Sequence, residues 1–550
     1  MPIVIVDGIE VQLASGERLN GIQAAERAGI DIPRYCWHPG LSVVASCRMC
    51  LVETGAKNAD TGAITMVPKL VPACQTPATD GTIFVTNSEK VRQSRAMVEE
   101  DLLIDHPIDC PICDKAGECL LQDYHFEHGQ NQRRADVRPF TSRRREMGET
   151  VALFVDRCVM CSRCVRFTRE ITGTAELMVI NRGSHEEIDV FPGFPLDNKM
   201  SGNVVDLCPV GALGDKDFLY QQRVWFMKKH AGICTGCSTG CSIDVEENQD
   251  HVYRLKPRAN PHVNEWWMCD EGRYGYHHVH SDQRLTNVGR GRAAEGNGHA
   301  VPAKVVDGPT NVEWSDALLE IDARLRKAGR LAAMLSPHLT VEEAYLLAKY
   351  ARSVDPEALI VLGPVPVIGQ DETFKTGFTI RAEKCPNRRG VEAIVAHFMG
   401  RVATFEDLLA EVTAGKVRAA WLSGGYMTDW IDAATAAGLE GLDTLVVQDM
   451  FSSPAWEKAT YQLPGTAFAE RDGSYVNVKD RLQTVQWAVR PPVGVRTEAS
   501  VYWELLKMPG MYKARKVLDE VAGEIIYFAA VGEAVGPLGV DLKTNLLAKA

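Results

Sequence analysis

The placement of the cysteines is the feature that most restricts the fold of this 550-residue chain. It has 16 cysteines, of which fifteen lie between Cys36 and Cys269 in four groups, and only Cys385 stands apart. The start of the chain, MPIVIVDGIE, shows no export signal. A disulfide framework is therefore the weaker interpretation and metal ligation the stronger one. The sequence predicts that the first 280 residues are organised around metal centres.

Composition and charge narrow the class of protein. The apolar content of 45% and the charged content of 24% are those of an ordinary globular chain, long enough for roughly three to five domains. The net charge of −12 argues against nucleic acid as a partner, because phosphate binding needs a basic face. No stretch approaches the ~20 uninterrupted apolar residues that span a bilayer. We expect a chain that does not cross a membrane but can dock on a membrane complex.

The first cysteine group follows a segment with a clear secondary-structure pattern. IVIVDGIEVQL alternates apolar and polar residues around an Asp7-Gly8 turn, which predicts a β-hairpin. ERLNGIQAAERAG places apolar residues on one helical face, and Gly29 is expected to end that helix. A hairpin, a helix and a cysteine loop resemble the β-grasp of plant-type ferredoxins, which hold a [2Fe–2S] cluster. The first cysteine spacing is ten residues and not four, so zinc stays an alternative. The candidate ligands are Cys36, Cys47, Cys50 and Cys74.

The third group gives the clearest motif. CVMCSRC and the later DLCPVGAL resemble the C-x2-C-x2-C-x3-C-P runs of two-cluster bacterial ferredoxins. In those proteins the last cysteine of each run ligates the other cluster. The ligands of one [4Fe–4S] cluster would be Cys158, Cys161, Cys164 and Cys208. The ligand positions of the other cluster are all changed together, to Thr168, Asn198, Ser201 and Val204. The sequence predicts a ferredoxin-like domain with one of its two clusters lost.

The fourth group has the spacing C-x2-C-x3-C-x27-C. It resembles the N-terminal [4Fe–4S] domain of molybdopterin-dependent oxidoreductases such as formate dehydrogenases. Zinc is again the alternative, but structural zinc sites usually have two close pairs, whereas three close cysteines and one distant one occur here. The candidate ligands are Cys234, Cys237, Cys241 and Cys269.

The second group, in DHPIDCPICDKAGEC, has three cysteines where a [4Fe–4S] cluster needs four ligands. His106 precedes it in an H-x3-C-x2-C-x5-C pattern. A histidine near cysteines is more often a surface or capping residue. Because the other twelve cysteines are assigned, we predict that His106 is the fourth ligand. The imidazole would make this cluster less negative and easier to reduce than an all-cysteine cluster. The candidate ligands are His106, Cys110, Cys113 and Cys119.

The chain resembles the family of the large iron–sulfur subunit of bacterial NADH:quinone oxidoreductase (respiratory complex I), because its four cysteine motifs agree in type and order with those of that family. MCDEGRYGY, residues 268–276, resembles that family's segment at the last cluster ligand. The resemblance implies that the [2Fe–2S], His-ligated and third clusters conduct electrons, and that the Cys234–Cys269 cluster lies off that path. It also implies a flavoprotein partner that binds NADH and FMN, other peripheral-arm subunits, an indirect link to the membrane arm, and a peripheral location on the cytoplasmic face of the inner membrane.

The C-terminal half has a different pattern. GRGRAAEGNGHAVPAKVVDGP suggests a linker. Beyond it, the apolar runs RLAAMLS, ALIVLG, VRAAWLSGG and DTLVVQD alternate with helical patterns such as EEAYLLAKYARSV and FEDLLAEVTAGK. The alternation predicts a parallel, doubly wound α/β domain. Residues 459–483 resemble a late segment of the molybdopterin oxidoreductase family, whose catalytic region is much longer, so we predict a reduced version of it.

Together these patterns predict a multidomain α+β and α/β chain. The expected domains are a β-grasp [2Fe–2S] ferredoxin at 1–88, a His/Cys-ligated [4Fe–4S] domain at 89–128, a [4Fe–4S] ferredoxin-like domain at 129–225, a molybdopterin-oxidoreductase-type [4Fe–4S] domain at 226–282, a linker at 283–312 and a reduced molybdopterin-oxidoreductase-like α/β domain at 313–550.

Molybdenum catalysis is not expected. Active formate dehydrogenases place a cysteine or selenocysteine on the metal, usually followed by histidine, but here Cys385 is followed by Pro386. They also carry a lysine two residues after the last cluster cysteine, where this chain has Glu271. We therefore expect Cys385 to be a buried or incidental thiol and no molybdopterin to bind. Iron-only hydrogenases share the first three modules, but they need further cysteine motifs that are lacking after Cys269.

The function that follows is one-electron transfer, with no catalytic acid, base or nucleophile in this chain. No G-x-G-x-x-G or G-x-x-x-x-G-K-[ST] motif is present, so NADH and flavin are expected on another subunit. The histidines of GYHHVH and the arginines of TSRRRE are expected in solvated faces or subunit contacts. The alternatives are the iron–sulfur subunit of a soluble NAD-linked hydrogenase or formate dehydrogenase, and a non-enzymatic scaffold or redox sensor.

Overall fold

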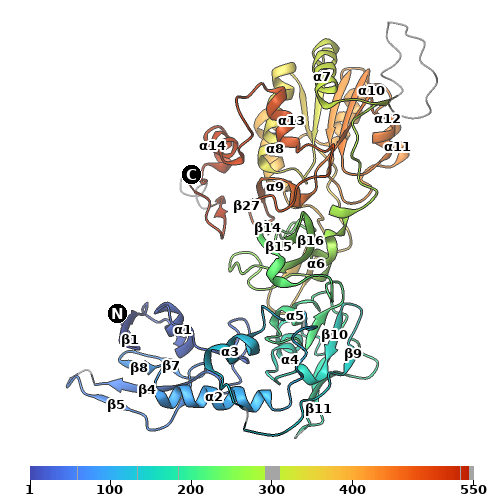
Figure 1. Ribbon diagram of the computed structural model, residues 1–550. Helices are drawn as coiled ribbons and strands as arrows, with labels where there is room; N and C mark the ends of the chain where they lie inside the picture. The colour runs from blue at the N-terminus through green and yellow to red at the C-terminus, as the bar shows by residue number, and fades with distance from the viewer. Residues whose placement is uncertain (59, 133, 184, 292–309, 533, 544–550) are drawn as a thin grey trace. The chain divides into compact units, whose positions relative to one another are not determined.

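The chain folds into two compact units (Figure 1). Unit 1 is Met1–Met227 with Phe374–Gly377, and unit 2 is Lys228–Thr373 with Phe378–Ala550. Among the described helices, none has the length and apolar character needed to cross a bilayer. The computed structural model describes residues 1–58, 60–132, 134–183, 185–291, 310–532 and 534–543.

Unit 1 begins with the predicted hairpin. Strand β1 (Ile3–Val6) pairs antiparallel with β2 (Ile9–Gln12), and Val6 faces Ile9 across the turn. Asp7 and Gly8 both have positive φ, at 45° and 85°, as a two-residue type I′ turn requires. Val4 and Val6 alternate inward and are fully buried, so the alternation in the sequence marks the core face.

The hairpin belongs to a mixed sheet of the β-grasp type. Its order is β2-β1-β8-β4-β5, with β6 paired to β4 on a side branch, and β1 runs parallel to β8. Helix α1 (Gly21–Arg27) packs its buried face, including Ile22 and Ala25, into the same core, and Asn20 closes a capping box with Gln23. The other strands of this sheet are β4 (Leu51–Lys57), β5 (Ile64–Met66), β6 (Val71–Pro72) and β8 (Thr82–Val85). Strands β3 (Leu19–Asn20) and β7 (Pro77–Ala78) form a separate two-stranded sheet.

Two helices carry the chain from the β-grasp to the second cysteine group. Helix α2 (Glu89–Leu103) starts at the N-cap Ser88, and α3 (Leu120–His128) starts directly after Cys119. Buried Glu99 of α2 accepts a 2.5 Å hydrogen bond from Tyr35 Oη. The Tyr35 ring also packs edge-on against Tyr124 of α3 at 5.3 Å. These contacts attach the helices to the loop that holds the first cysteine.

The next segment has the ferredoxin-like arrangement that the third motif predicts. A three-stranded sheet of order β13-β10-β9 lies beside the hairpin β11/β12, and the short helix α4 (Arg163–Phe167) begins within the cysteine run and includes Cys164. The elements are β9 (Arg144–Glu146), β10 (Val151–Phe154), β11 (Leu177–Ile180), β12 (Glu187–Val190), α5 (Asn203–Leu207) and β13 (Leu213–Asp215).

The positions at which the sequence predicts a lost cluster are occupied by side chains that contact the protein itself. Thr168 is fully buried and donates to the Val165 carbonyl at 3.1 Å. Ser201 is 1% exposed and its hydroxyl lies 2.7 Å from that of Thr150. Val204 is also fully buried. Their side chains are packed and hydrogen-bonded where a second cluster would have its ligands.

Unit 2 starts with the three-stranded antiparallel sheet β14-β15-β16. Its strands are β14 (Lys228–Ile233), β15 (Ser242–Asn248) and β16 (His251–Pro257). The fourth cysteine group lies around it, because three cysteines occupy the β14–β15 connection and Cys269 immediately precedes helix α6 (Asp270–Tyr274).

Most of the rest of unit 2 forms the predicted doubly wound α/β domain. Its five parallel strands have the spatial order β25-β24-β23-β19-β20, the flavodoxin-like arrangement with the first two strands reversed at one edge. All four apolar runs singled out in the sequence are strands of this sheet. The strands are β19 (Leu331–Leu335), β20 (Leu359–Leu362), β23 (Ala419–Ser423), β24 (Thr444–Asp449) and β25 (Tyr461–Pro464).

Helices cover both sides of this sheet. Helix α8 packs on β19 and α12 packs on β24, and Figure 1 shows α8 and α11 on opposite sides. The two predicted helical segments are α8 and α10, and α8 begins with a Thr340–Glu343 capping box. The helices are α7 (Trp314–Ala328), α8 (Val341–Val354), α9 (Arg388–Met399), α10 (Phe405–Thr413), α11 (Ala433–Ala437), α12 (Pro454–Lys458), α13 (Glu498–Leu505) and α14 (Ala514–Glu524).

The expected linker at 283–312 needs a correction at its two ends. Strand β17 (Gly289–Arg290) pairs antiparallel with β25, and β18 (Thr310–Asn311) pairs with β17. These short strands extend the sheet to seven strands and are part of the domain. A glycine- and arginine-rich segment carries no alternation from which this pairing could be predicted. Residues 292–309 of the expected linker lie outside the described residues.

Candidate metal centres

The first cysteine group forms a buried set of thiols beside the β-grasp core. Cys36, Cys50 and Cys74 are at most 1% exposed. The thiol of Cys47 forms a hydrogen bond with that of Cys36, and the thiol of Cys50 forms one with that of Cys74. The bond from Cys47 lowers the pKa of Cys36. The chain thus brings together all four predicted ligands, from a loop, the start of β4 and the end of β6.

Two buried arginines connect this group to the third one. Arg163 donates to the carbonyl of Trp37 at 2.6 Å and to that of Leu207 at 3.2 Å. Arg166 Nη2 donates to the carbonyls of two predicted ligands, Cys36 and, at 3.3 Å, Cys161. A single guanidinium group therefore links the backbones of two candidate centres. Neither arginine could be assigned from the motifs, since the acceptors in the first group, Trp37 and Cys36, lie more than 120 residues away.

The third group lines one small, mostly apolar cavity. Its walls include Leu153, Ile188 and Leu213 together with the four cysteines of the group. Burial raises the pKa of Cys161 to about 11 and is the main cause of the raised pKa of Cys158 and Cys164. Such a dry pocket of converging sulfur ligands suits a cluster whose irons bind thiolates. The cysteines are Cys158, Cys161, Cys164 and Cys208.

The second group is more open than the others. Cys110 is exposed, Cys119 is half-buried and Cys113 is buried. His106 lies beside Asp109 and Arg157, which form an ion pair at 2.9 Å, and Arg157 is also a neighbour of Cys113. Burial lowers the pKa of His106 to about 4, with a smaller contribution from Arg157. The imidazole is therefore neutral at pH 7, the form that binds iron. The ligand role of His106 stays a prediction.

The second and third groups are direct neighbours in unit 1. Leu120, which follows Cys119, donates its backbone N–H to the carbonyl of Pro209, which follows Cys208, at 2.9 Å. Gly211 lies so close to the second group that a Cβ atom there would be 2.1 Å from Cys113 Sγ. The glycine in CPVGAL is thus explained by the approach of another candidate centre and not by a turn.

In the fourth group, unlike the other three, all four candidate ligands are buried. Cys234, Cys237, Cys241 and Cys269 are between 3% and 7% exposed, and burial is the main cause that raises the pKa of three of them. Gly272 N–H points at Cys269 Sγ at 3.4 Å. A Cβ atom at Gly272 would lie 2.7 Å from Cys234 Sγ. The first turn of α6 therefore approaches the sulfurs as closely as only glycine allows.

An ion pair borders this fourth group. Lys384 Nζ lies 2.7 Å from Glu271 Oε2, although the two residues are 113 positions apart. Both line a pocket that also includes Cys234 and Gly272. Cys385 is fully buried, as predicted, and burial raises its pKa. The cysteine motifs contain no indication of Lys384.

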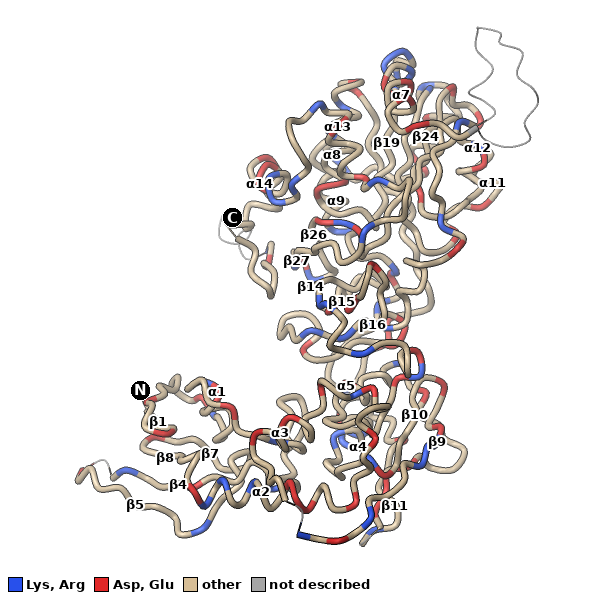
Figure 2. The backbone as a smooth tube through the Cα atoms, viewed as in Figure 1, with Lys and Arg blue, Asp and Glu red and all other residues tan. Residues whose placement is uncertain are grey.

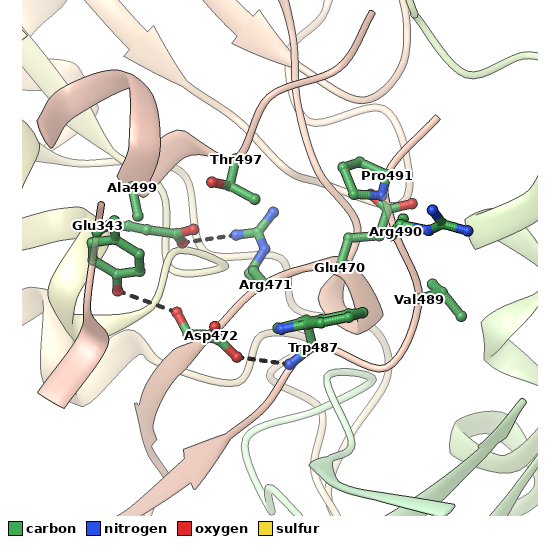
Figure 3. A pocket seen from close by; sticks show the side chains of 11 residues that line it. Glu343, Glu470, Arg471, Asp472, Trp487, Val489, Arg490, Pro491, Thr497 and Ala499 are labelled. Carbon is green, nitrogen blue, oxygen red and sulfur yellow. Dashed lines mark hydrogen bonds and ion pairs between the residues drawn. The ribbon is translucent and has the colours of Figure 1, made fainter. Parts of the chain in front are cut away.

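The C-terminal domain has a separate pocket built on a buried ion network (Figure 3). Arg471 and Glu343 point toward one another there, with Nη1 and Oε2 2.9 Å apart, and Arg471 Nη2 is 3.4 Å from Glu498 Oε1. All three side chains are at most 3% exposed. The network joins α8 and α13 to the segment after β25, which lies within residues 459–483.

The basic and histidine-rich stretches make contacts within the protein. Arg143 pairs with Asp156 at 2.8 Å, and Arg145 pairs with Asp189 at 2.9 Å. Lysines and arginines are interspersed with acidic residues along both units (Figure 2). His280 stacks on His251 at 4.2 Å and accepts a hydrogen bond from the Val252 N–H. These side chains have structural partners close by.

Zinc was the alternative for the first and fourth groups. A mononuclear zinc site needs its ligands to converge on one ion. Within the part of the chain that the structure describes, no three His, Cys, Asp or Glu side chains are arranged to hold a single metal ion.

Five protein families match consecutive parts of the chain. Residues 3–89 match the 2Fe-2S iron-sulfur cluster binding domain, and 95–134 match the NADH-ubiquinone oxidoreductase-G iron-sulfur binding region. Residues 148–214 match the ferredoxin-like domain of NADH-quinone oxidoreductase subunit 3. Residues 227–281 match the molybdopterin oxidoreductase Fe4S4 domain, and 400–508 match molybdopterin oxidoreductase. The predicted fold class is confirmed, and iron–sulfur domains of both the 2Fe-2S and the 4Fe-4S type are present.

Curated relatives agree with these families. The NADH-quinone oxidoreductase G subunit of Rickettsia felis is 34% identical over 344 residues, which are 62% of this chain and 47% of that protein. The mitochondrial NADH dehydrogenase [ubiquinone] iron-sulfur protein 1 of Solanum tuberosum is 37% identical over 315 residues, 57% of this chain and 39% of that protein. The chain thus spans about half the length of these relatives, or less.

One solved structure shows a limited likeness. It is a crystal structure of an NAD+-reducing [NiFe]-hydrogenase in the H2-reduced state, with 27% sequence identity and a TM-score of 0.33. The match covers 40% of this chain and 91% of that one.

Proposed function

From its homology to the G subunits of NADH-quinone oxidoreductases, we propose that this chain is the electron-transfer subunit of an NADH:quinone oxidoreductase. It holds one [2Fe–2S] and three [4Fe–4S] clusters on the fifteen grouped cysteines and His106. An iron–sulfur cluster supplies one-electron transfer without bond chemistry. The chain's own residues bind the irons, exclude water and tune the potentials, and none acts as a catalytic acid, base or nucleophile.

The contact between the candidate centres of unit 1 carries this proposal. Arg166 bridges the first and third groups through the carbonyls of Cys36 and Cys161. The backbone hydrogen bond from Leu120 to Pro209 joins the third group to the second. The third group therefore contacts both the first and the second, and we propose that electrons pass in the order first, third, second. Exposed Cys110 places the second group at the surface of the unit.

The partners follow from the same proposal. A flavoprotein that binds NADH and FMN delivers single electrons to the first group, and another peripheral subunit receives them from the second on the way to quinone. The chain sits peripherally on the cytoplasmic face of the inner membrane. The Cys234–Cys269 cluster lies outside this path. No molybdopterin binds, because Cys385 is buried beside proline and Glu271 replaces the expected lysine.

Metal analysis of protein purified without air tests the cluster content. One [2Fe–2S] and three [4Fe–4S] clusters correspond to about fourteen irons per chain. A metal content dominated by zinc would refute the proposal, and about ten irons would mean that one [4Fe–4S] cluster is missing.

Purification of the intact complex tests the assignment to quinone reduction. We expect membrane subunits to co-purify and NADH to reduce the clusters within the turnover time. A nickel or molybdenum subunit in their place would instead identify the chain as part of a soluble hydrogenase or formate dehydrogenase. Clusters that NADH does not reduce in the native complex would indicate a sensor or scaffold.

A further inference from the structure

The fourth cysteine group has a charged pair at its border that belongs to none of the cluster motifs. Glu271 lies in the first turn of α6, two residues after Cys269. Lys384 comes from the segment before α9 and reaches Glu271 with a 2.7 Å ion pair. Its side chain is only 11% exposed, whereas that of Glu271 is 51% exposed. The lysine is thus the more enclosed member of the pair.

The backbone holds Lys384 against the cysteine loop. Ser238, which follows Cys237, donates its N–H to the carbonyl of Glu383 at 2.9 Å. Lys384 itself donates its N–H to the carbonyl of Pro366 at 2.8 Å. The position of the ammonium group relative to the sulfurs therefore depends on two backbone hydrogen bonds and on the ion pair.

Both charges border the sulfurs. Lys384 and Glu271 line one pocket together with Cys234 and Gly272. A positive charge at this border favours negative charge on a group held by these cysteines, and a negative charge opposes it, because unlike charges attract and like charges repel.

We infer that Lys384 and Glu271 together set the reduction potential of the cluster held by Cys234, Cys237, Cys241 and Cys269. The inference rests on the proposed function, since it requires a cluster at this site. Reduction adds one electron, and therefore one negative charge, with no ligand bond formed or broken. Lys384 stabilises that added charge and Glu271 destabilises it. Lys384 acts through its positive charge and is not a ligand of the cluster.

This arrangement also explains the unusual residue two positions after the last cysteine. A glutamate alone at this place would make the cluster harder to reduce, because like charges repel. Lys384 offsets that effect from a different part of the fold. The expected consequence is that the two residues have opposite effects on the potential and that their effects are coupled.

The test is a redox titration of the full chain, purified without air and followed by electron spin resonance. The signal of the fourth cluster is the one that disappears in Cys237→Ala. Lys384→Gln should shift its midpoint to a more negative potential, and Glu271→Gln should shift it to a more positive one. The double variant should lie between the two single variants. Lys384→Arg keeps the charge and should keep the wild-type midpoint.

A matched control separates a local effect from a general change in charge. Lys416 forms an exposed ion pair with Glu411 at 3.1 Å and lies just before strand β23 begins. The pocket of the fourth group includes Met427, which lies beyond the other end of that strand. Lys416→Gln should therefore leave the midpoint unchanged. Equal shifts in Lys384→Gln and Lys416→Gln would overturn the inference.

Other outcomes distinguish this inference from the proposed function. If the wild-type chain contains no fourth [4Fe–4S] cluster by iron content and spectrum, the proposed function fails at this site. If the cluster is present but neither single variant shifts its midpoint, only the inference on the ion pair is wrong. If the Lys384→Gln variant loses iron, the midpoint of the Glu271→Gln variant becomes the test. An unshifted midpoint in Glu271→Gln would then overturn the inference.

Discussion

Replacing Gly272 by alanine should remove the fourth cluster and leave the other three in place. A Cβ atom at this position would lie 2.7 Å from Cys234 Sγ and 3.5 Å from Cys269 Sγ. Non-bonded heavy atoms prefer separations of about 3.5–4.0 Å, so the two groups would have to move apart by about 1 Å. A metal site needs its ligands within about 0.5 Å of their proper positions. The site cannot absorb the added methyl group without losing its geometry.

Helix propensity alone would favour the Gly272→Ala variant, although this variant is expected to lose the cluster. Gly272 lies inside α6, where alanine is favoured over glycine by about 1 kcal/mol. Loss of the cluster would therefore result from the close approach to sulfur and not from a weakened helix. Gly275, at the end of the same helix, has no heavy atom within 4 Å of its ideal Cβ position and has an ordinary φ of −72°. It provides the matched control.

The assay is iron content and the electron spin resonance spectrum of each variant, purified without air. Gly272→Ala should contain about ten irons per chain and Gly275→Ala about fourteen. The signal missing from Gly272→Ala should be the one that is missing from Cys237→Ala. A full complement of iron with an unchanged spectrum in Gly272→Ala would refute the reasoning, since it would show that the sulfurs are not held at this helix turn.

Three further predictions concern unit 1. His106→Cys should keep a [4Fe–4S] cluster at a lower potential, and His106→Ala should give a labile one; unchanged midpoints in both would refute the ligand assignment. Arg166→Met leaves three carbonyls without their donor and should lower the free energy of unfolding by about 3 kcal/mol. Urea denaturation measures this loss, and the control Arg169→Met, at an exposed position, should behave as wild type. Burial raises the pKa of Glu99 to about 7, so the folded protein holds a proton there that the unfolded chain releases at lower pH. The free energy of unfolding should therefore fall by about 1 kcal/mol from pH 6 to pH 8, and Glu99→Gln should remove this dependence on pH. An equal slope in Glu99→Gln would show that another group is responsible.

The sequence by itself determined the local parts of this protein. Alternation around Asp7-Gly8 predicted the hairpin, and the four apolar runs predicted the parallel strands of the C-terminal sheet. The cysteine spacings predict the four ligand groups, and the role of these residues as ligands stays a prediction. These signals are readable because the periods of strands and helices, and the spacing of ligands in a loop, depend on residues close in the chain.

Only the tertiary structure decided how these parts meet. The spatial strand order and the added strands β17 and β18 depend on pairing between distant segments. Arg166 reaches Cys36 across 130 positions, and Lys384 reaches Glu271 across 113. The need for glycine at 272 likewise comes from sulfurs on another segment. Such contacts leave no periodic trace in the sequence, because a single polar side chain finds its partner only after the core has packed and brought the two segments together.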